Sequence, residues 1–266
     1  MPVVSAALTD LGLRRAANED SYVLRPGLGL YAVCDGMGGH AAGEIASRVA
    51  ADTIEAFIQH TDGVGAGFTW PFAFNPEWGT SGNRLVSALM LANRAIAQRV
   101  VDEPSLRGMA TTAVCLLLGT RESGLGSRED SGPALFAHVG DSRAYLWRGG
   151  ELDQITRDHS WVEEQVTLGV LSETEARHHP WRNLVTRALA GAEEPRVERT
   201  PMNLEPGDRV LLCSDGLTSP LTNAAIAEIL ARTPMGRPDE LCQALVDAAN
   251  NAGGPDNITV IVVEVT

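Results

Sequence analysis

Short apolar runs bounded by turn-forming residues recur along the whole chain. Each run has Gly, Pro, Asp or Asn within two residues of at least one of its ends, and several are rich in β-branched residues, which is typical of β-strands. The runs that predict strands are Val3–Leu8, Leu28–Cys34, Thr111–Leu118, Ala134–Val139, Ala144–Trp147, Arg196–Met202, Arg209–Cys213 and Ile258–Val265.

Helical periodicity is found in two pairs of segments that lie between these runs. Ala42–Gln59 and Arg84–Val101 repeat small and apolar residues at helical spacing, and Asn223–Arg232 and Pro238–Asn250 form a second pair. Strands cluster and helices come in pairs, so the order does not fit the regular alternation of a doubly wound parallel sheet. The pattern instead predicts an α+β domain in which antiparallel sheets are covered by helices.

Two long segments interrupt this pattern. Residues 60–82 are rich in glycine and aromatic residues and predict a long ordered insertion, whose aromatic side chains we expect to pack on the first helix pair rather than to bind a partner. Residues 159–187 are polar and include the adjacent His178 and His179. Neighbouring residues do not share a face of a helix or strand, so we expect both histidines to have surface roles. Arg121–Gly132 is expected to connect a hairpin.

Composition narrows the class of protein. The chain has 266 residues, 44% of them hydrophobic, and a formal net charge of −13. It can bury a sizeable core, and its negative charge disfavours binding to nucleic acid or to anionic membranes. No apolar run approaches the ~20 residues of a membrane span, and no signal peptide is recognisable, so we expect a cytoplasmic protein. The four cysteines form no CxxC motif and are expected to be reduced core thiols.

The segment that follows the second predicted strand suggests metal chemistry. Asp35 ends the strand, and glycines at 36, 38 and 39 precede His40 and a predicted helix. Glycines let the backbone approach an ion or a phosphate closely, and a carboxylate beside a free carbonyl suits Mg²⁺ or Mn²⁺. Taken alone, however, an Asp-Gly pair at a strand end most often marks a turn.

The same arrangement recurs elsewhere in the chain. Asp215 follows another apolar strand, Asp141 lies between two strands, and Asp256 precedes the last strand. Glu19 and Asp20 add two further carboxylates near a predicted strand edge. Clustered carboxylates repel one another unless cations neutralise them. The recurrence therefore predicts a binuclear site for hard metal ions.

Six motifs occur in the order found in metal-dependent protein serine/threonine phosphatases of type 2C, bacterial branch, and the chain resembles that family from about Thr9 to Val265. They are RRAANED, DGMGGH, GMATT, GDSR, SDGL and GPDNIT. The resemblance implies a four-layer α-β-β-α sandwich of two antiparallel sheets flanked by helix pairs. It also implies one catalytic domain over residues 1–266, with a flap at about 157–187 and an insertion at about 60–82.

The resemblance assigns metal ligands residue by residue. Asp35 matches the carboxylate that bridges two Mn²⁺ or Mg²⁺ ions, and the carbonyl of Gly36 matches a ligand of one of them. Asp215 and Asp256 match the other ligands of this binuclear centre. Asp141 matches a ligand of a third, weaker Mn²⁺ or Mg²⁺ site.

Further residues match groups that surround the metals. Glu19 and Asp20 match outer carboxylates that hold metal-bound waters, and Arg15 matches the arginine that binds the substrate phosphate. His40 matches a histidine that acts either as general acid for the leaving hydroxyl or as a hydrogen-bonding partner of a metal-bound water. The implied mechanism is attack on phosphorus by a metal-bridging hydroxide without a covalent intermediate.

The resemblance implies an enzyme that hydrolyses phosphoserine and phosphothreonine in proteins and opposes a bacterial serine/threonine kinase. We expect a monomer that binds phosphorylated proteins, the kinase and its substrates among them. One alternative is a catalytically weak or inactive phosphatase fold used as a binding module. A metal-dependent nuclease is disfavoured by the acidic charge, and a phosphatase of the sporulation-regulator type is disfavoured by the DGMGGH motif and the flap segment.

Overall fold

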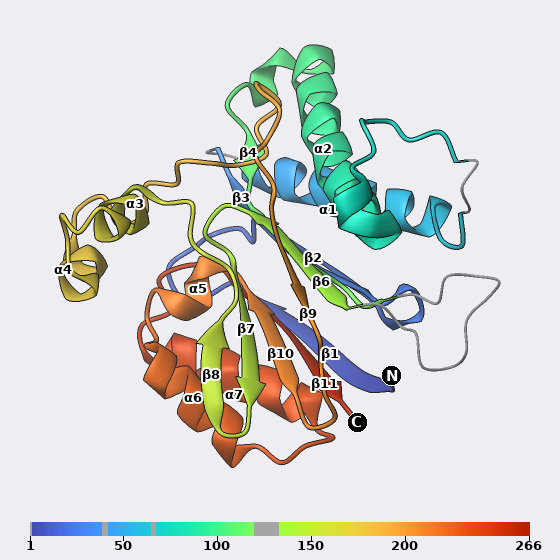
Figure 1. Ribbon diagram of the computed structural model, residues 1–266. Coiled ribbons are helices and arrows are strands. Elements are labelled where there is room, and N and C mark those ends of the chain that lie inside the picture. The colour runs from blue at the N-terminus through green and yellow to red at the C-terminus, as the bar shows by residue number, and fades with distance from the viewer. Residues whose placement is uncertain (1, 39–41, 65–67, 120–132) are drawn as a thin grey trace.

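The computed structural model describes residues 2–38, 42–64, 68–119 and 133–266. Two antiparallel sheets pack face to face, with one helix pair on each outer side (Figure 1). The strands are β1 (Val3–Asp10), β2 (Asp20–Arg25), β3 (Leu30–Met37), β4 (Ala110–Thr111), β5 (Ala113–Leu117), β6 (Ala134–Val139), β7 (Arg143–Arg148), β8 (Glu151–Gln154), β9 (Glu198–Met202), β10 (Arg209–Cys213) and β11 (Ile258–Val265). The α-helices are α1 (Ala42–His60), α2 (Gly79–Asp102), α3 (Trp161–Thr167), α4 (Glu173–His178), α5 (Asp215–Thr218), α6 (Asn223–Arg232) and α7 (Pro238–Asn251).

Each sheet combines strands from separate parts of the chain. The first sheet has the strand order β1-β11-β10-β7-β8, and the second has the order β2-β3-β5-β6-β9, with the short β4 paired to the end of β3. The last strand lies between β1 and β10 in the first sheet. As a result, segments from the beginning, middle and end of the sequence meet at the same end of the sandwich.

Three apolar layers hold the sandwich together. Tyr31 and Val33 of the second sheet pack with Val210 and Ile261 of the first sheet between the two sheets. A second layer lies between α1, α2 and the outer face of the second sheet. A third lies between α6, α7 and the first sheet. Each helix buries one apolar stripe, as the sequence periodicity predicts, and the predicted four-layer α+β architecture is confirmed.

Several strands differ from the predicted pattern. The predicted strand Thr111–Leu118 is split into β4 and β5 at Thr112. The sequence pattern missed β2 because charged residues lie at both of its ends, and it missed β8 because that strand is polar and lies at a sheet edge. Both strands depend on pairing with a neighbour rather than on an apolar alternation of their own.

The polar segment after β8 contains two short helices that the periodicity did not predict. Ser160 caps α3, and Ser172 forms a capping box with Glu175 at the start of α4. Both helices are too short to show an apolar stripe, but their capping residues are recognisable in the sequence. In Figure 1 they lie to one side of the sandwich, joined to it by two extended connections.

The aromatic insertion packs on the first helix pair, as expected. Phe72 lies beneath Arg94 of α2, with the guanidinium carbon 4.1 Å from the ring centre. Phe68 makes an edge-to-face contact with Trp70 and with His60 at the end of α1. Because α2 begins at Gly79, the insertion is shorter than the predicted 60–82. The predicted hairpin connection at 121–132 lies outside the described residues.

Other expectations from composition can be compared with the structure. All four cysteines are buried and free of disulfides, in agreement with their prediction as core thiols. Within the described ranges, no helix combines the length and the apolar character needed to cross a bilayer. His178 is exposed on α4, whereas His179 is partly buried against the ring of Trp161, at a centroid distance of 4.9 Å.

Candidate metal centre

A cleft of about 370 Å³ lies at the end of the sandwich where the connections from both sheets meet. Its wall is acidic apart from one arginine, four alanine or glycine residues, Met37, and two residues that follow α4. Seven of the residues predicted for the site line it: Arg15, Glu19, Asp35, Gly36, Asp141, Asp215 and Asp256. Asp20 lies below the cleft as a buried residue. The position of His40 is outside the described residues.

Asp35 lies within β3 rather than at its tip, because β4 pairs with the next two residues of the strand. Its backbone is held firmly by two threonines of the GMATT motif. The carbonyl oxygen of Asp35 accepts hydrogen bonds from Thr111 Oγ1 (2.8 Å) and from the Thr112 amide (2.9 Å). The Asp35 amide donates to Thr112 Oγ1 at 3.1 Å, and that hydroxyl also contacts Ser142 Oγ at 2.7 Å. Thr112 thereby connects the strand that carries Asp35 to the loop that contains Asp141 and Ser142.

Asp20 connects the two sheets beneath the cleft. Its Oδ2 accepts hydrogen bonds from Ser214 Oγ (2.8 Å) and Thr259 Oγ1 (2.6 Å), which lie next to β10 and in β11. Its Oδ1 is buried and has no hydrogen-bond partner among the described residues. A buried carboxylate oxygen without a donor is costly, so this atom favours a cationic or water ligand.

Asp215 and Asp256 come from connections in the first sheet. Asp215 is the first residue of the short helix α5, directly after β10, and Asp256 lies in the turn before β11. Arg15, from the loop between β1 and β2, donates to Asp256 Oδ2 at 2.5 Å and remains half exposed to the cleft. The structure thus places a cation with a fork of donors at the mouth of an acidic site.

The Arg15 loop is held in place by one amide side chain. Asn257 donates through Nδ2 to the carbonyl oxygens of Leu11 (2.9 Å) and Ala17 (3.0 Å). Its Oδ1 accepts from the Glu19 amide at 2.9 Å. Asn257 follows Asp256 directly, so one turn supplies a carboxylate to the cleft and also fixes the loop that carries Arg15.

Gly36 occupies a position that has no room for a side chain. A Cβ atom there would lie 2.1 Å from the carbonyl oxygen of Gly43 and 2.5 Å from that of Glu19. The start of α1 and the end of the Arg15 loop can therefore approach β3 this closely only because residue 36 is glycine.

Electrostatics at the cleft disfavour several negative charges together. Burial raises the pKa of Asp35 well above the ordinary aspartate range, and the neighbouring carboxyls of Asp20, Asp215 and Asp141 act in the same direction. Burial likewise raises the pKa of Asp20 to about 7, that of Asp141 to about 8 and that of Asp215 to about 6. Such shifts are expected where carboxyl groups share a site.

These residues fit a pair of hard divalent cations. The donor set consists of carboxylate and carbonyl oxygens, which Mg²⁺ and Mn²⁺ prefer. A bound cation would offset the repulsion that raises the carboxyl pKa values. Its positive charge would also stabilise the Asp20 oxygen that has no hydrogen-bond partner among the described residues.

Sequence reasoning identified the charged groups but missed the neutral residues that position them. The missed residues are the hydroxyl and amide groups described above, Thr111, Thr112, Ser142, Ser214, Asn257 and Thr259. All six lie inside the quoted motifs, and Ser142, Ser214, Asn257 and Thr259 are within three residues of a predicted ligand. A hydroxyl or amide residue beside a predicted carboxylate ligand was the signal that could have found these four, whereas Thr111 and Thr112 have no such neighbour in the sequence.

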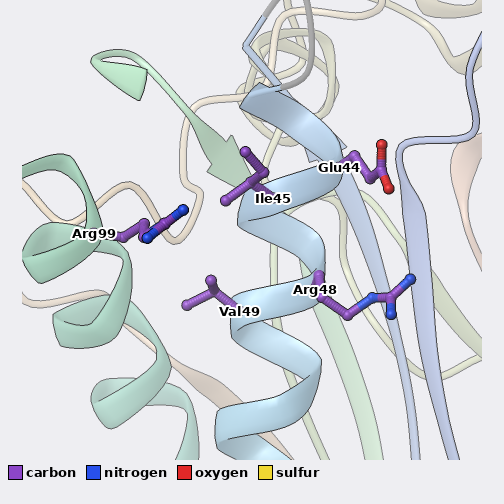
Figure 2. A pocket seen from close by; sticks show the side chains of 5 residues that line it. All are labelled: Glu44, Ile45, Arg48, Val49 and Arg99. Carbon is purple, nitrogen blue, oxygen red and sulfur yellow. The ribbon is translucent and has the colours of Figure 1, made fainter. Parts of the chain in front are cut away.

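A second hollow lies between α1 and α2, and Figure 2 shows Ile45 and Val49 of α1 pointing toward Arg99 of α2. Glu44 and Arg48 complete its lining, and none of these residues belongs to the predicted site. The chemistry suggested by the sequence is therefore concentrated in the acidic cleft.

Comparisons with known proteins agree with this site. Residues 14–248 match the family described as protein phosphatase 2C. The chain is 41% identical over 261 residues to the serine/threonine protein phosphatase PstP of Mycobacterium tuberculosis. The alignment covers 98% of this chain but 44% of PstP, so the chain spans less than half the length of that relative. It is 37% identical over 262 residues to protein phosphatase PhpP of Streptococcus pneumoniae, covering 96% of the chain and 95% of PhpP.

A solved structure extends the comparison to the fold. The catalytic domain of PstP in complex with two manganese ions superposes with a TM-score of 0.75 at 38% identity, covering 99% of both chains. Sequence, fold and the acidic cleft therefore agree on one assignment. The chain belongs to the protein phosphatase 2C family.

Proposed function

We propose that this protein hydrolyses phosphoserine and phosphothreonine in proteins at a binuclear Mn²⁺ or Mg²⁺ centre in the acidic cleft. The observation that carries the proposal is the convergence of Asp35, Asp215 and Asp256 with Arg15 in one cleft. Supporting it, the relatives PstP and PhpP are named as phosphatases, and the PstP catalytic domain has been solved with two manganese ions.

Each side chain has a distinct task in this proposal. Asp35, Asp215 and Asp256 would hold the ions, with the carbonyl of Gly36, and the buried Asp20 would accept from water at the floor of the cleft. When bound, such a metal pair activates water and neutralises charge on a phosphoryl group. Arg15 would orient the phosphate, because its planar fork matches two phosphoryl oxygens.

The proposal is tested by phosphate release from a phosphothreonine peptide, measured with Mn²⁺ and then with excess EDTA. Turnover that requires the metal, and that is lost in an Asp215→Asn variant which remains folded, would support it. Absence of turnover in folded, metal-loaded protein would contradict it and would favour the binding-module alternative. A phosphotyrosine peptide of the same sequence tests the residue specificity.

Finer features are part of the same proposal. Asp141 would contribute to a third, weaker metal site, because it lines the cleft and its pKa is raised to about 8 by burial and by Asp215.

We also propose that residues 1–266 act as one catalytic domain, that the protein works as a cytoplasmic monomer, and that its substrates are those of a bacterial serine/threonine kinase. Gel filtration and phosphoproteomics of a deletion strain test the last two points.

A further inference from the structure

His159 lies at the junction of three segments that surround the cleft. It is 4% exposed and follows β8, just before the cap of α3. Its main-chain amide donates to the Gly140 carbonyl oxygen at 2.9 Å, and its own carbonyl oxygen accepts from the Thr186 amide at 2.8 Å. The Gly140 amide donates in turn to Nδ1 of the His159 ring at 3.1 Å. One buried residue therefore holds two other segments of the chain.

Both of those segments form part of the cleft wall. Gly140 immediately precedes Asp141, and Thr186 immediately follows Val185, and both Asp141 and Val185 line the cleft. Val185 is also joined by a β-bridge to Ser160, the neighbour of His159. The bonds that His159 makes therefore join the segment that carries Asp141 to the segment that carries Val185.

The backbone at Gly140 is constrained from a second side. Its φ of +112° lies in a region that favours glycine, and a Cβ there would lie 2.6 Å from the Cβ of Thr112. Thr112 is one of the two threonines that hold the backbone of Asp35. The turn that carries Asp141 is therefore fixed between Thr112 and His159.

The hydrogen bond from Gly140 also defines the state of the His159 ring. Because Nδ1 accepts, it carries no proton, and the proton of the neutral ring resides on Nε2. Nε2 lies 3.1 Å from Oε1 of Glu198, which is bound to Arg187 at 2.9 Å as well. Burial, with the stacked His138 ring next, lowers the pKa of His159 to about 4, so the ring remains neutral near pH 7.

A metal ion is a poorer occupant for this cluster. His138, His159 and Glu198 do place ligand atoms within 4.8 Å of one another. However, binding through Nε2 of His159 would require the proton to move to Nδ1, where it would face the Gly140 amide. Arg187 already neutralises Glu198. The cluster is better explained as a hydrogen-bonded support.

We propose that His159 is a positioning residue which, through Nδ1, fixes the Asp141 turn against the wall of the cleft formed by Val185. His159 lines no part of the cleft itself and acts on the reaction through Gly140 and Asp141. The predicted effect on turnover rests on the proposed phosphatase function, whereas the predicted effect on the Gly140 amide does not.

Three substitutions at His159 distinguish the role of the hydrogen-bond acceptor at Nδ1 from that of the rest of the ring. In His159→Asn, the amide oxygen can take the place of Nδ1, whereas His159→Gln moves its amide toward the position of Nε2, and His159→Leu removes both. We expect His159→Gln and His159→Leu to lose roughly 10-fold to 100-fold in kcat, as is common when a residue supporting a metal ligand is lost. His159→Asn should retain most of the activity. His178→Leu, on the exposed face of α4, is the matched control and should be unchanged.

Hydrogen exchange of the Gly140 amide provides a measurement that needs no turnover. This amide should exchange slowly in the wild-type protein and in His159→Asn, and much faster in His159→Gln. If exchange is equally slow in all three, or if His159→Asn loses as much activity as His159→Gln, the positioning role is wrong. If His159→Leu fails to fold, the comparison of Asn with Gln still decides the question. If the wild-type protein has no phosphatase activity, the exchange rates alone test the proposal.

Discussion

Asp20 and Asp35 lie directly opposite each other in the antiparallel pair of β2 and β3. Two carboxylates at opposing positions of a sheet repel each other, and such a pair is normally avoided. Here Ser214 and Thr259 donate to one oxygen of Asp20, while its other oxygen has no partner among the described residues. Asp20 therefore has one oxygen that is held by two hydroxyls and one oxygen that is unsatisfied, and it faces the second carboxyl group of Asp35, an arrangement that favours cation binding over stability.

The first prediction concerns the hydroxyl that supports Asp20. Thr259→Val keeps the shape of the side chain but removes the donor to Asp20 Oδ2. Loss of a hydrogen bond to this buried carboxyl group should lower the free energy of unfolding by about 1–3 kcal/mol. Urea denaturation measures this change. Thr259→Ser, which keeps the hydroxyl, is the control, and equal losses in both variants would show that packing rather than the hydrogen bond matters.

A second prediction concerns Arg15 and its neighbour in sequence. If Arg15 binds the substrate phosphate, Arg15→Ala should lose charge-assisted hydrogen bonds worth about 1.5–3 kcal/mol, or roughly 10-fold to 100-fold in kcat/KM. Arg15→Lys should recover only part of this loss, since lysine lacks the planar fork. Steady-state kinetics with a phosphothreonine peptide provide the measurement.

Arg14 offers a matched control, because it is exposed in the same loop. Arg14→Ala removes an equal charge and should change kcat/KM little. Equal losses in the Arg14 and Arg15 variants would indicate a general attraction of the anionic substrate rather than a specific phosphate contact.

A third prediction follows from the raised pKa of Asp141. The pKa is about 8 in the folded protein, against an ordinary value of 3.8, chiefly because of burial. In EDTA-treated protein, the folded state thus holds a proton that the unfolded state has released. The stabilisation from this group is fully present below pH 4 and is lost as the pH rises to about 8.

The Asp141→Asn variant lacks this titration. Its melting temperature, relative to that of the wild-type protein in EDTA, should rise as the pH increases from 4 to 8 and then level off. Asp52→Asn, at an exposed position of α1, is the control for the loss of one aspartate side chain elsewhere in the protein. If the difference in melting temperature between Asp141→Asn and the wild-type protein does not change with pH, the raised pKa of Asp141 is wrong.

A fourth prediction distinguishes the two roles considered for His40. A general acid is needed most when the leaving group is a poor one, such as the hydroxyl of threonine, and little when it is p-nitrophenolate. If His40 donates that proton, His40→Asn should slow hydrolysis of a phosphothreonine peptide by about 10²-fold to 10⁴-fold and hydrolysis of p-nitrophenyl phosphate far less. Equal losses with both substrates would favour a role in holding water near the metals.

The sequence predicted the layered fold and the charged residues of the cleft because both leave local signals. The apolar runs that precede Asp35 and Asp215 are visible within a few residues. The support around Asp20 is different, since its donors Ser214 and Thr259 lie 194 and 239 residues away. The pairing of β11 with β10 brings the two donors together, and the packing of one sheet on the other brings them to Asp20 in β2.

The short helices were missed for another reason. α3 and α4 have too few turns for an apolar period to show, and their positions are set by capping residues and by contacts such as that between Trp161 and Trp181. The role of His159 depends on the same long-range assembly, because Gly140, Thr186 and Glu198 reach it from separate segments.

The central claim is that the acidic cleft is the binuclear metal centre, and anomalous diffraction from crystals grown with Mn²⁺ tests it most directly. Two strong anomalous peaks should appear among Asp35, Asp215 and Asp256, about 3.5–4 Å apart. In crystals of Asp35→Asn, at least one peak should be lost while the fold is retained. Manganese bound elsewhere with this cleft empty, or two undiminished peaks in Asp35→Asn, would contradict the assignment of the ligands.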